Sequence, residues 1–198
     1  MVWCRAVDEL LQVLCIKGRA KPDSLAAAVD VDVAAVIEQC EQAGLVENTK
    51  LGYRVTDIGR SRADERYATE RLVAGPVIEG VYEAFLPIND QVKQIVTDWQ
   101  LREVDGATVL NDHQDAAYDA RVIARLRDLD ADVEAALGRL SSALPRFDGY
   151  ARRLRRALDA ISAGDHTMVA APIKDSYHTV WFELHEELLV LSGRQRTE

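Results

Sequence analysis

The fold depends on residues 32–60, which read DVAAVIEQCEQAGLVENTKLGYRVTDIGR. Asp32 is a good N-cap for a helix, because its carboxylate can accept a backbone N–H of the first turn. Gly44 ends that helix, since glycine reaches the left-handed conformation at little cost. Between the two lie apolar residues at helical spacing, which predict one buried stripe: Val33, Val36, Ile37 and Cys40.

A β-hairpin is predicted directly after this helix. Residues 45–46 begin one strand, residues 48–52 supply turn-forming side chains, and residues 53–55 return as the second strand. Thr56 can then cap a further helix that begins near Asp57. Helix, hairpin and helix in this order are typical of a winged helix-turn-helix, so the sequence predicts that fold here.

Two more helices are expected upstream, the second with Pro22 in its first turn, where the missing N–H costs nothing. Downstream of the hairpin, the next helix is expected to end near Val73, because Pro76 disfavours helix at the residue before it. The chain therefore divides into a winged helix-turn-helix domain over residues 1–73 and a second domain over residues 74–198.

Residues 74–198 have helical periodicity almost throughout. A kink is expected at Pro87, because the apolar stripe continues past the proline. Residues 101–111 contain the pair Asp105-Gly106 and are interpreted as a loop.

Three further helices are expected after that loop. The first is capped by Asn111 or Asp112 and extends to Leu140, the second is closed by Gly164, and the third begins near Lys174. Helices joined by short connections predict an antiparallel bundle, used for dimerisation or ligand binding. The expected fold class is therefore mainly α, with three helices and a hairpin wing followed by a helical bundle.

The composition is that of an ordinary globular protein, with 198 residues, 48% hydrophobic and 29% charged. No run of about 18 apolar residues occurs, so no membrane contact is expected, and the N-terminus does not resemble a signal peptide. Three cysteines without a Cys-x-x-Cys pair are typical of buried thiols in a reducing compartment. We therefore expect a cytoplasmic protein.

The net charge of −9 does not favour nucleic-acid binding. Residues 1–73 hold ten Lys/Arg against twelve Asp/Glu, a balance of −2, and residues 74–198 hold fourteen against twenty-one, a balance of −7. Neither part has the basic excess that is typical of a strong DNA-binding domain. Any contact with DNA must depend on how the charges are arranged locally.

The segments EQAGLVE and YRVTDIGRSRAD resemble the winged-helix domain of MarR-type bacterial regulators, a likeness that covers residues 9–62. The resemblance implies a DNA-binding transcriptional regulator. TDWQLR, NDHQDAAYDARV and SYHTVWFELHEELL are similar to a helical region of actinobacterial proteins, in some of which it is attached to the mobile domain of phosphoenolpyruvate-utilising enzymes. The phosphohistidine segment of that mobile domain does not occur in this sequence, so the resemblance implies no phosphotransfer.

In winged helix-turn-helix domains the helix before the hairpin enters the major groove of double-stranded DNA, and the wing lies along phosphates or the minor groove. Gln39 and Gln42 can bond adenine edges, and Ala35 can touch a thymine methyl. Two such helices must be held one DNA turn apart, which favours a homodimer. Surrounding cations can contact the DNA backbone, unless they are ordinary solvated charges: Lys17, Arg19, Lys21, Lys50, Arg54 and Arg60.

An alternative interpretation follows from the same helix, which contains no Lys or Arg and places Glu38 and Glu41 on its outer side. Carboxylates repel phosphates, so the alternative is a winged-helix module that binds another protein and no DNA. A negative surface around the helix and the wing favours this alternative, and a positive one favours DNA.

The richest group of aromatic and hydrogen-bonding side chains lies in residues 74–198. Such a group can line a pocket for a small-molecule effector, or its members can be helix caps and core. A metal site from His113, His178 and His185 is a third interpretation, but the seven-residue spacing of the last two exceeds the familiar i,i+4 pair, and no metal is expected. The candidates for ligand binding are Trp99, Asn111, Asp112, His113, Tyr118, Tyr177, His178, Trp181 and His185.

Residues 152–156 contain four arginines around one leucine. We expect a charged outer helix face that pairs with acids of neighbouring helices. Binding of an anionic ligand or of an acidic partner surface is the alternative.

Catalytic motifs are not found in the sequence. It has no Gly-rich phosphate-binding loop, no nucleophile elbow and no paired Cys and His in a plausible setting. We therefore expect neither an enzyme nor a cofactor, and the leading prediction is a MarR-like regulator of transcription.

Overall fold

The computed structural model describes residues 2–194, with side chains from Arg5 onward. The protein is mainly helical and has two separate two-stranded antiparallel sheets. Within this range, no helix is long and apolar enough to cross a membrane. The first elements in chain order are α1 (Val2–Lys17), α2 (Pro22–Ala28), α3 (Val33–Gln42), β1 (Val46–Thr49) and β2 (Gly52–Val55).

The predicted boundaries of α3 are confirmed. Asp32 Oδ1 accepts the backbone N–H of Ala35 over an N···O distance of 3.2 Å, as expected of an N-cap. Gly44 follows the helix with a φ angle of +68°. The apolar stripe is buried, which leaves the opposite face of the helix for other contacts.

The hairpin β1–β2 also forms as predicted, with Val46 opposite Val55 and Thr49 opposite Gly52. Its second strand pairs in turn with the segment before α2, because the backbone groups of Ala20 and Tyr53 exchange hydrogen bonds of 3.0 and 2.8 Å. This extra pairing anchors the base of the hairpin to the start of α2.

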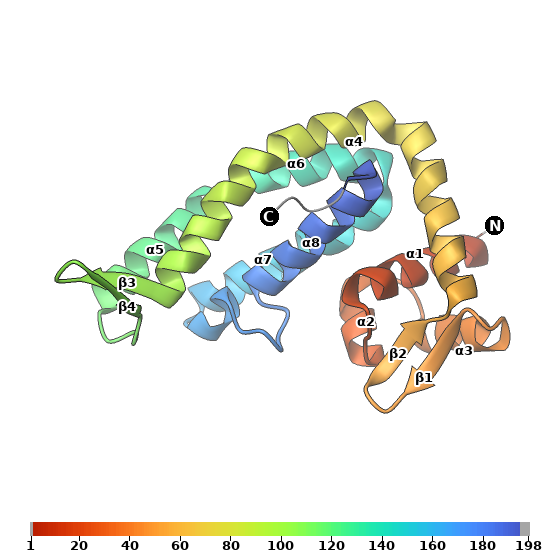
Figure 1. Ribbon diagram of the computed structural model, residues 1–198, viewed down its shortest axis with the longest axis horizontal. Helices are drawn as coiled ribbons and strands as arrows, with labels where there is room; N and C mark the ends of the chain where they lie inside the picture. Colours follow the sequence, from red (N-terminus) through yellow and green to blue (C-terminus); the bar gives the residue numbers. More distant parts are fainter. Residues whose placement is uncertain (1, 195–198) are drawn as a thin grey trace.

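Helix α4 (Asp57–Gln100) contains 44 residues, so the predicted end at Val73 is wrong. Thr56 caps it, its hydroxyl accepting the Gly59 N–H at 3.2 Å. Pro76 removes one helical hydrogen bond and clashes with the preceding turn, yet buried apolar side chains continue on both sides of it. The helix bends instead of ending: Figure 1 shows a sharp bend in its first half.

Residues 101–111 form a second hairpin, so their prediction as a loop is wrong. The strands are β3 (Leu101–Val104) and β4 (Ala107–Leu110). Asp105 and Gly106 both have positive φ angles, 52° and 81°. Such a two-residue turn matches the twist of antiparallel strands, and Asp-Gly is one of its preferred sequences.

The predicted long helix after residue 111 is two helices, α5 (Ala116–Asp128) and α6 (Asp130–Ala143). The N-cap is Asp115, which accepts the Tyr118 N–H at 2.9 Å, and neither Asn111 nor Asp112 caps this helix. Charges favour the break at Leu129: basic residues occupy the last turn of α5 and acidic residues the first turn of α6, as the helix dipoles prefer.

The chain then continues through a short 3-10 helix, η1 (Pro145–Phe147), into α7 (Asp148–Ser162). A second 3-10 helix, η2 (His166–Val169), precedes α8 (Tyr177–Ser192). Ser176 caps α8, so the helix begins three residues after the predicted Lys174. After the bend, α4 contacts α5, α6 and α8, and α7 contacts α6 and α8.

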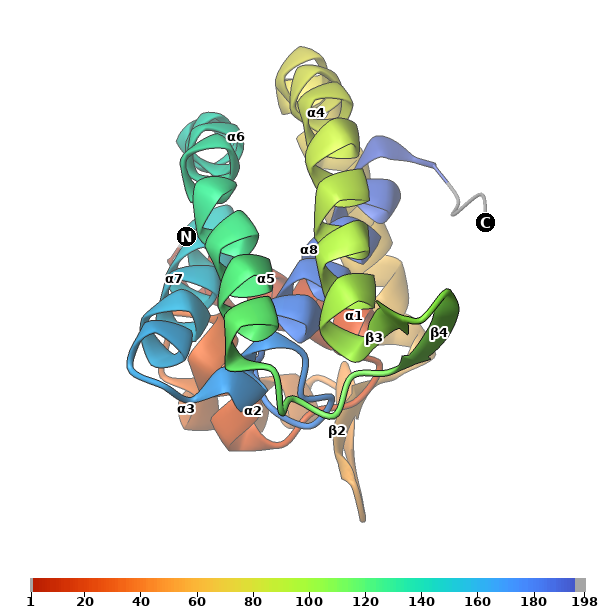
Figure 2. The same cartoon turned by 90° about the vertical axis from the view of Figure 1, so that its left-hand side faces the viewer.

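Helix α4 links the two ends of the molecule. In Figure 1 its first part rises from α1–α3 and the β1–β2 hairpin, and its second part runs beside α6 and α8 to the β3–β4 hairpin. Figure 2 shows α5 and α6 next to α4, with α7 on the other side of α5. A single cluster of buried hydrophobic side chains extends from α1–α3 to α8, so a shared core, and no linker, connects residues 1–73 to the rest.

Candidate functional site

The outer face of α3 is open to solvent. Glu38, Gln39 and Gln42 are exposed and Ala35 is half-buried, and together they line a shallow, open depression. Gln42 Nε2 donates to Glu38 Oε1 at 3.3 Å. The C-terminal helices do not cover this face, and both glutamine amides can be reached by a partner.

The β1–β2 hairpin projects from the body of the protein beside α3 (Figures 1 and 2). Lys50 and Leu51 occupy its tip, and Leu51 is 66% exposed. Arg54 forms an ion pair with Glu47, its partner across the strands. Charge neutralisation by Glu47 reduces the attraction of Arg54 for an anion, so Lys50 is the more available cation of the hairpin.

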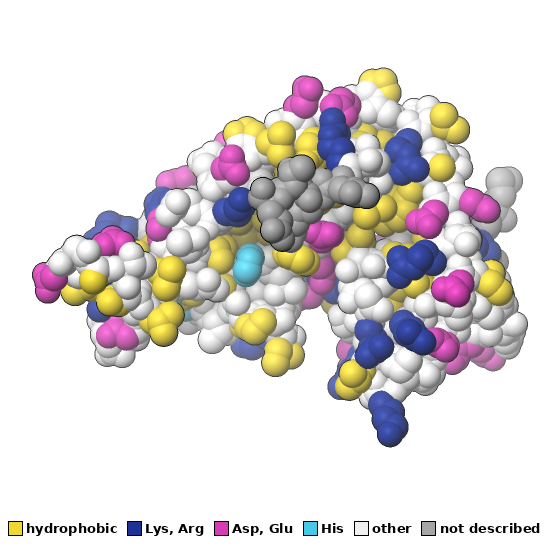
Figure 3. Space-filling view, viewed as in Figure 1, with side chains coloured by type: hydrophobic (Ala, Val, Ile, Leu, Met, Phe, Trp, Pro, Cys, Tyr) yellow, Lys and Arg dark blue, Asp and Glu magenta, His cyan; other side chains and the backbone are white. Residues whose placement is uncertain are grey.

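Further cations surround the base of the hairpin. Arg19 and Lys21 are exposed on either side of Ala20, the residue that pairs with Tyr53 of β2. Arg60 is exposed on the first turns of α4. Figure 3 shows Lys and Arg side chains over this end of the molecule, with Asp and Glu side chains interspersed among them.

Lys17 was among the residues predicted to contact DNA, and its position in the structure corrects that prediction. Its side chain is only 7% exposed, and its Nζ donates to Glu183 Oε1 of α8 at 2.7 Å. Asp175 lies 3.9 Å from the same ammonium group. Lys17 is therefore a buried link between α1 and α8 and cannot reach a phosphate.

Four of the predicted ligand-binding residues meet at the far end of the bundle. The His113 ring lies against the Trp99 ring, tilted by 37°, with 4.4 Å between ring centroids. Asn111 Nδ2 donates to the Trp99 carbonyl at 3.1 Å and to Asp119 Oδ1 at 2.9 Å. His113 Nδ1 lies 2.9 Å from Asp119 Oδ2. Tyr118 follows on α5, one residue before Asp119.

Asp119, which the sequence analysis omitted from the candidates, is the centre of this group. Its side chain is buried and orients both His113 and Asn111. His113 has a positive φ of 56°, uncommon outside glycine, and these bonds help to hold it there. Asp112 points elsewhere and pairs with Arg102 at 3.1 Å.

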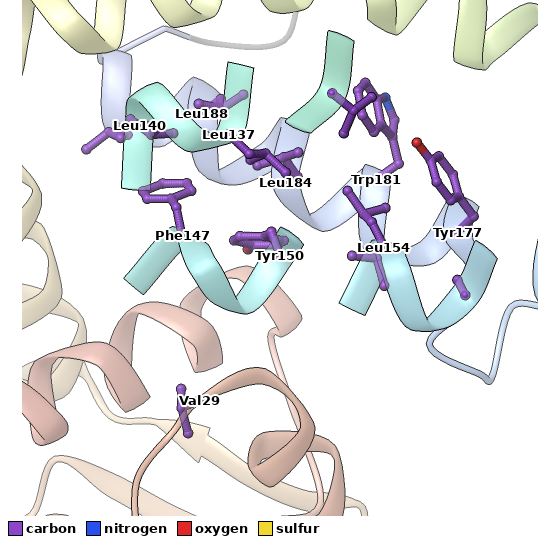
Figure 4. Close-up of a cluster of buried hydrophobic side chains, with 14 of the residues drawn as sticks. Val29, Leu137, Leu140, Phe147, Tyr150, Leu154, Tyr177, Trp181, Leu184 and Leu188 are labelled. Carbon is purple, nitrogen blue, oxygen red and sulfur yellow. The ribbon is translucent and has the colours of Figure 1, made fainter. Parts of the chain in front are cut away.

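The other candidates do not join this group. Tyr177 and Trp181 are 1% and 3% exposed and belong to the core, where Figure 4 shows their rings beside Leu154. His178 and His185 are half-buried on α8. The nine residues therefore do not line one pocket, and Tyr177 and Trp181 agree with the alternative interpretation that members of the group are core.

The three histidines of the metal interpretation are also far apart. The ring centroid of His113 lies 4.4 Å from that of Trp99. The ring centroid of His185 lies 5.3 Å from that of Phe85. Trp99 and Phe85 are fourteen residues apart on α4, which corresponds to about 21 Å along a helix. One metal ion cannot bridge these positions.

A buried ion network connects the two parts of the chain, and the sequence analysis did not predict it. Arg146 Nη2 donates to Glu70 Oε2 at 2.8 Å, and its Nη1 donates to Glu187 Oε1. Tyr150 Oη donates to the other oxygen of Glu187 at 2.5 Å. Gln12 of α1 donates to Glu70 at 3.1 Å. Helices α1, α4, α7 and α8 thus meet around one guanidinium.

The electrostatics of this network are those of a structural element. Burial by itself raises the pKa of Glu70, but the hydrogen bonds and charge of Arg146 outweigh it, so the pKa lies below its usual value. Burial and the nearby Glu187 carboxylate raise the pKa of Tyr150 well above its usual value. Glu70 therefore stays charged, and Tyr150 stays a hydrogen-bond donor.

A sequence signal for these buried charges exists. Glu70 occupies the buried stripe of α4 between Tyr67 and Ala74, and Glu187 occupies that of α8 between Leu184 and Leu191. A carboxylate in an apolar stripe indicates a buried partner.

In the arginine-rich run of residues 152–156, Arg155 is exposed and paired with Asp130 of α6, as predicted.

Comparison of the chain with protein-family models, with curated proteins and with solved structures finds no match.

Proposed function

We propose that this protein is a DNA-binding transcriptional regulator, with a winged helix-turn-helix over residues 1–73 and a helical bundle over residues 74–198. The observation that carries the proposal is the exposed outer face of α3 beside a projecting hairpin with Lys50 at its tip. This arrangement lets a helix enter a groove while the wing contacts the flanking backbone.

In the proposed complex Gln39 and Gln42 bond base edges in the major groove, and Ala35 contacts a thymine methyl. Backbone contacts come from exposed cations of the wing and its base: Arg19, Lys21, Lys50, Arg54 and Arg60. Glu38 and Glu41 oppose the binding, and the chain as a whole carries −9. Affinity is therefore low away from the matching sequence and falls steeply with salt.

The regulator acts as a homodimer, because two recognition helices one DNA turn apart read a two-fold symmetric site. Exposed apolar side chains on α4 support self-association: Leu72 is 88% exposed and Val73 is 79% exposed. Side chains of this kind are costly to leave in water.

Fluorescence anisotropy at low salt tests the proposal, with DNA from upstream of the protein's own gene and a shuffled duplex of the same composition. We expect preference for the upstream duplex, reduced by Gln39→Ala and Gln42→Ala, each by about 1–3 kcal/mol for a direct base contact. Lys50→Ala lowers affinity for both duplexes, and Lys93→Ala, an exposed cation on the second half of α4, changes neither. Equal affinity for both duplexes contradicts sequence-specific regulation.

A second candidate function is a protein-binding winged helix, favoured by the two carboxylates and the lack of cations on α3. Charge reversal separates the two functions. The double variant Glu38→Lys, Glu41→Lys is expected to bind DNA more strongly if α3 contacts phosphates. If α3 instead contacts a basic protein, the double variant is expected to lose that binding.

A further inference from the structure

An open groove lies at the far end of the bundle, between the β3–β4 hairpin, the end of α4 and α5. Its volume is about 620 Å³, within the usual range of small-molecule sites. The apolar part of the lining comes from Leu101, Val122 and the ring of Tyr118. The Tyr118 hydroxyl is already used, because it donates to the Asp98 carbonyl at 2.8 Å.

Three arginines line the same groove. Arg121 and Arg125 are one turn apart on α5 and therefore share a helix face, and Arg102 comes from β3. The acids in the lining are Asp98, which pairs with Arg125, and Glu103, which accepts the Thr108 hydroxyl. The groove therefore has one more cation than it has anions.

Two guanidinium groups retain unused donors. In the part of the chain that the structure describes, no carboxylate pairs with Arg121, whose guanidinium carbon lies 5.7 Å from the centroid of the Tyr118 ring. Arg102 Nη2 bonds Asp112 at 3.1 Å, but its Nε is buried and has no hydrogen-bond partner among the described residues. A buried N–H without an acceptor costs free energy.

We propose that this groove binds a small organic anion. A carboxylate or phosphate group accepts hydrogen bonds from Arg102 and Arg121, whose planar forks match such oxyanions. An apolar body attached to that group lies against Tyr118, Leu101 and Val122. The site is separate from α3 and the wing, so anion binding does not depend on DNA binding.

Isothermal titration calorimetry on the full chain without DNA tests the site with three probes. Benzoate carries both an oxyanion and an apolar ring, inorganic phosphate carries the oxyanion alone, and benzyl alcohol carries the ring alone. We expect benzoate to bind more tightly than phosphate and benzyl alcohol not to bind. Benzyl alcohol binding as tightly as benzoate would overturn the role of the arginines, and phosphate binding as tightly as benzoate would overturn that of the apolar wall.

Arginine variants identify the groove as the place of binding. Arg121→Gln and Arg102→Gln are each expected to weaken benzoate roughly tenfold or more, the effect of losing a charge-assisted hydrogen bond. Arg139→Gln, an exposed arginine of α6 outside this groove, is the control and leaves the affinity unchanged. Unaltered affinity in both groove variants, or no benzoate binding to the wild type, refutes the proposal. The outcome of these benzoate titrations does not affect the interpretation of the fluorescence anisotropy measurements with DNA.

Discussion

Lys17 Nζ donates to Glu183 Oε1 at 2.7 Å, although 166 residues separate the two in sequence. Arg153 of α7 donates to the other oxygen of the same carboxylate, also at 2.7 Å, and holds Asp175 with two further bonds of 2.8 Å. The C-terminal end of α1 is therefore tied to α7 and α8 by paired charges, which helps to fix the position of α1 relative to these two helices.

Replacement of Lys17 by methionine removes this tie while keeping the side-chain volume. We expect a loss of about 2 kcal/mol in the free energy of unfolding, because a mostly buried carboxylate loses one of its two cationic partners. Urea denaturation measures it, with Lys93→Met as an exposed control that changes stability little. Equal stability of the two variants would show that the tie contributes nothing.

Replacement of Arg146 by leucine leaves Glu70 and Glu187 buried without their shared cation. At pH 7 the expected loss is about 3–5 kcal/mol, the usual effect of removing one partner of a buried ion pair. Arg66→Leu is the matched control, since Arg66 also bonds Glu70 but is 39% exposed; its expected effect is under about 1 kcal/mol.

The stability of the wild type depends on pH through Glu70. The pKa of Glu70 is lower in the folded state than in the unfolded state. The contribution of Glu70 to the free energy of unfolding is therefore fully present above the unfolded-state pKa of about 4.3, and it is lost as the pH falls through the folded-state pKa. In Arg146→Leu the largest influence that lowers this pKa is lost and only Gln12 and Arg66 still oppose the effect of burial, so the pKa of Glu70 rises and the variant gains stability from protonation. The stability difference between wild type and Arg146→Leu therefore narrows from pH 7 towards pH 4, and urea titrations showing a constant difference would contradict this account.

Replacement of Trp181 tests whether this residue stabilises the core, as its burial indicates. Trp181 Nε1 donates to buried Asn89 Oδ1 at 3.1 Å, and the ring stacks on Phe85 with centroids 4.8 Å apart. Trp181→Phe leaves the Asn89 oxygen unpaired and is expected to cost about 1–3 kcal/mol. His178→Ala, on the same helix but half-buried, costs under about 1 kcal/mol by thermal unfolding. Comparable losses from both would contradict the different burial of the two positions.

Gly52 of β2 cannot accept a side chain without displacing the wing. Its φ is +116°, and an added Cβ would lie 2.4 Å from the carbonyl oxygen of Ala20. Gly52→Ala is expected to lower the free energy of unfolding by about 2 kcal/mol or more and to weaken the proposed DNA binding. Gly138→Ala, in open space on α6, is expected to stabilise the protein by about 0.5–1 kcal/mol. Chemical denaturation of both variants checks that the two substitutions change the free energy of unfolding in opposite directions.

Much of the local structure was predictable, because its causes lie within a few residues. The Asp32 cap, the stop at Gly44 and the Thr56 cap depend on side chains next to the backbone groups that they satisfy. The β3–β4 turn belongs to the same class, since Asp105-Gly106 is a strong hairpin signal. The flanking strands are only four residues long and mostly exposed, so no buried alternating stripe marks them in the sequence.

The sequence by itself therefore determined the caps of α3 and α4, the β1–β2 turn and the apolar stripes, all of which arise from interactions over one or two turns of chain. Only the tertiary structure decided that α4 bends and does not stop at Pro76, because packing on both sides of the proline offsets the lost hydrogen bond. It also decided that Lys17 and Arg146 are internal, while Arg121 pairs with no carboxylate of the described residues. Whether a charge faces water or a carboxylate depends on which distant helix lies beside it, and no local pattern records that neighbour.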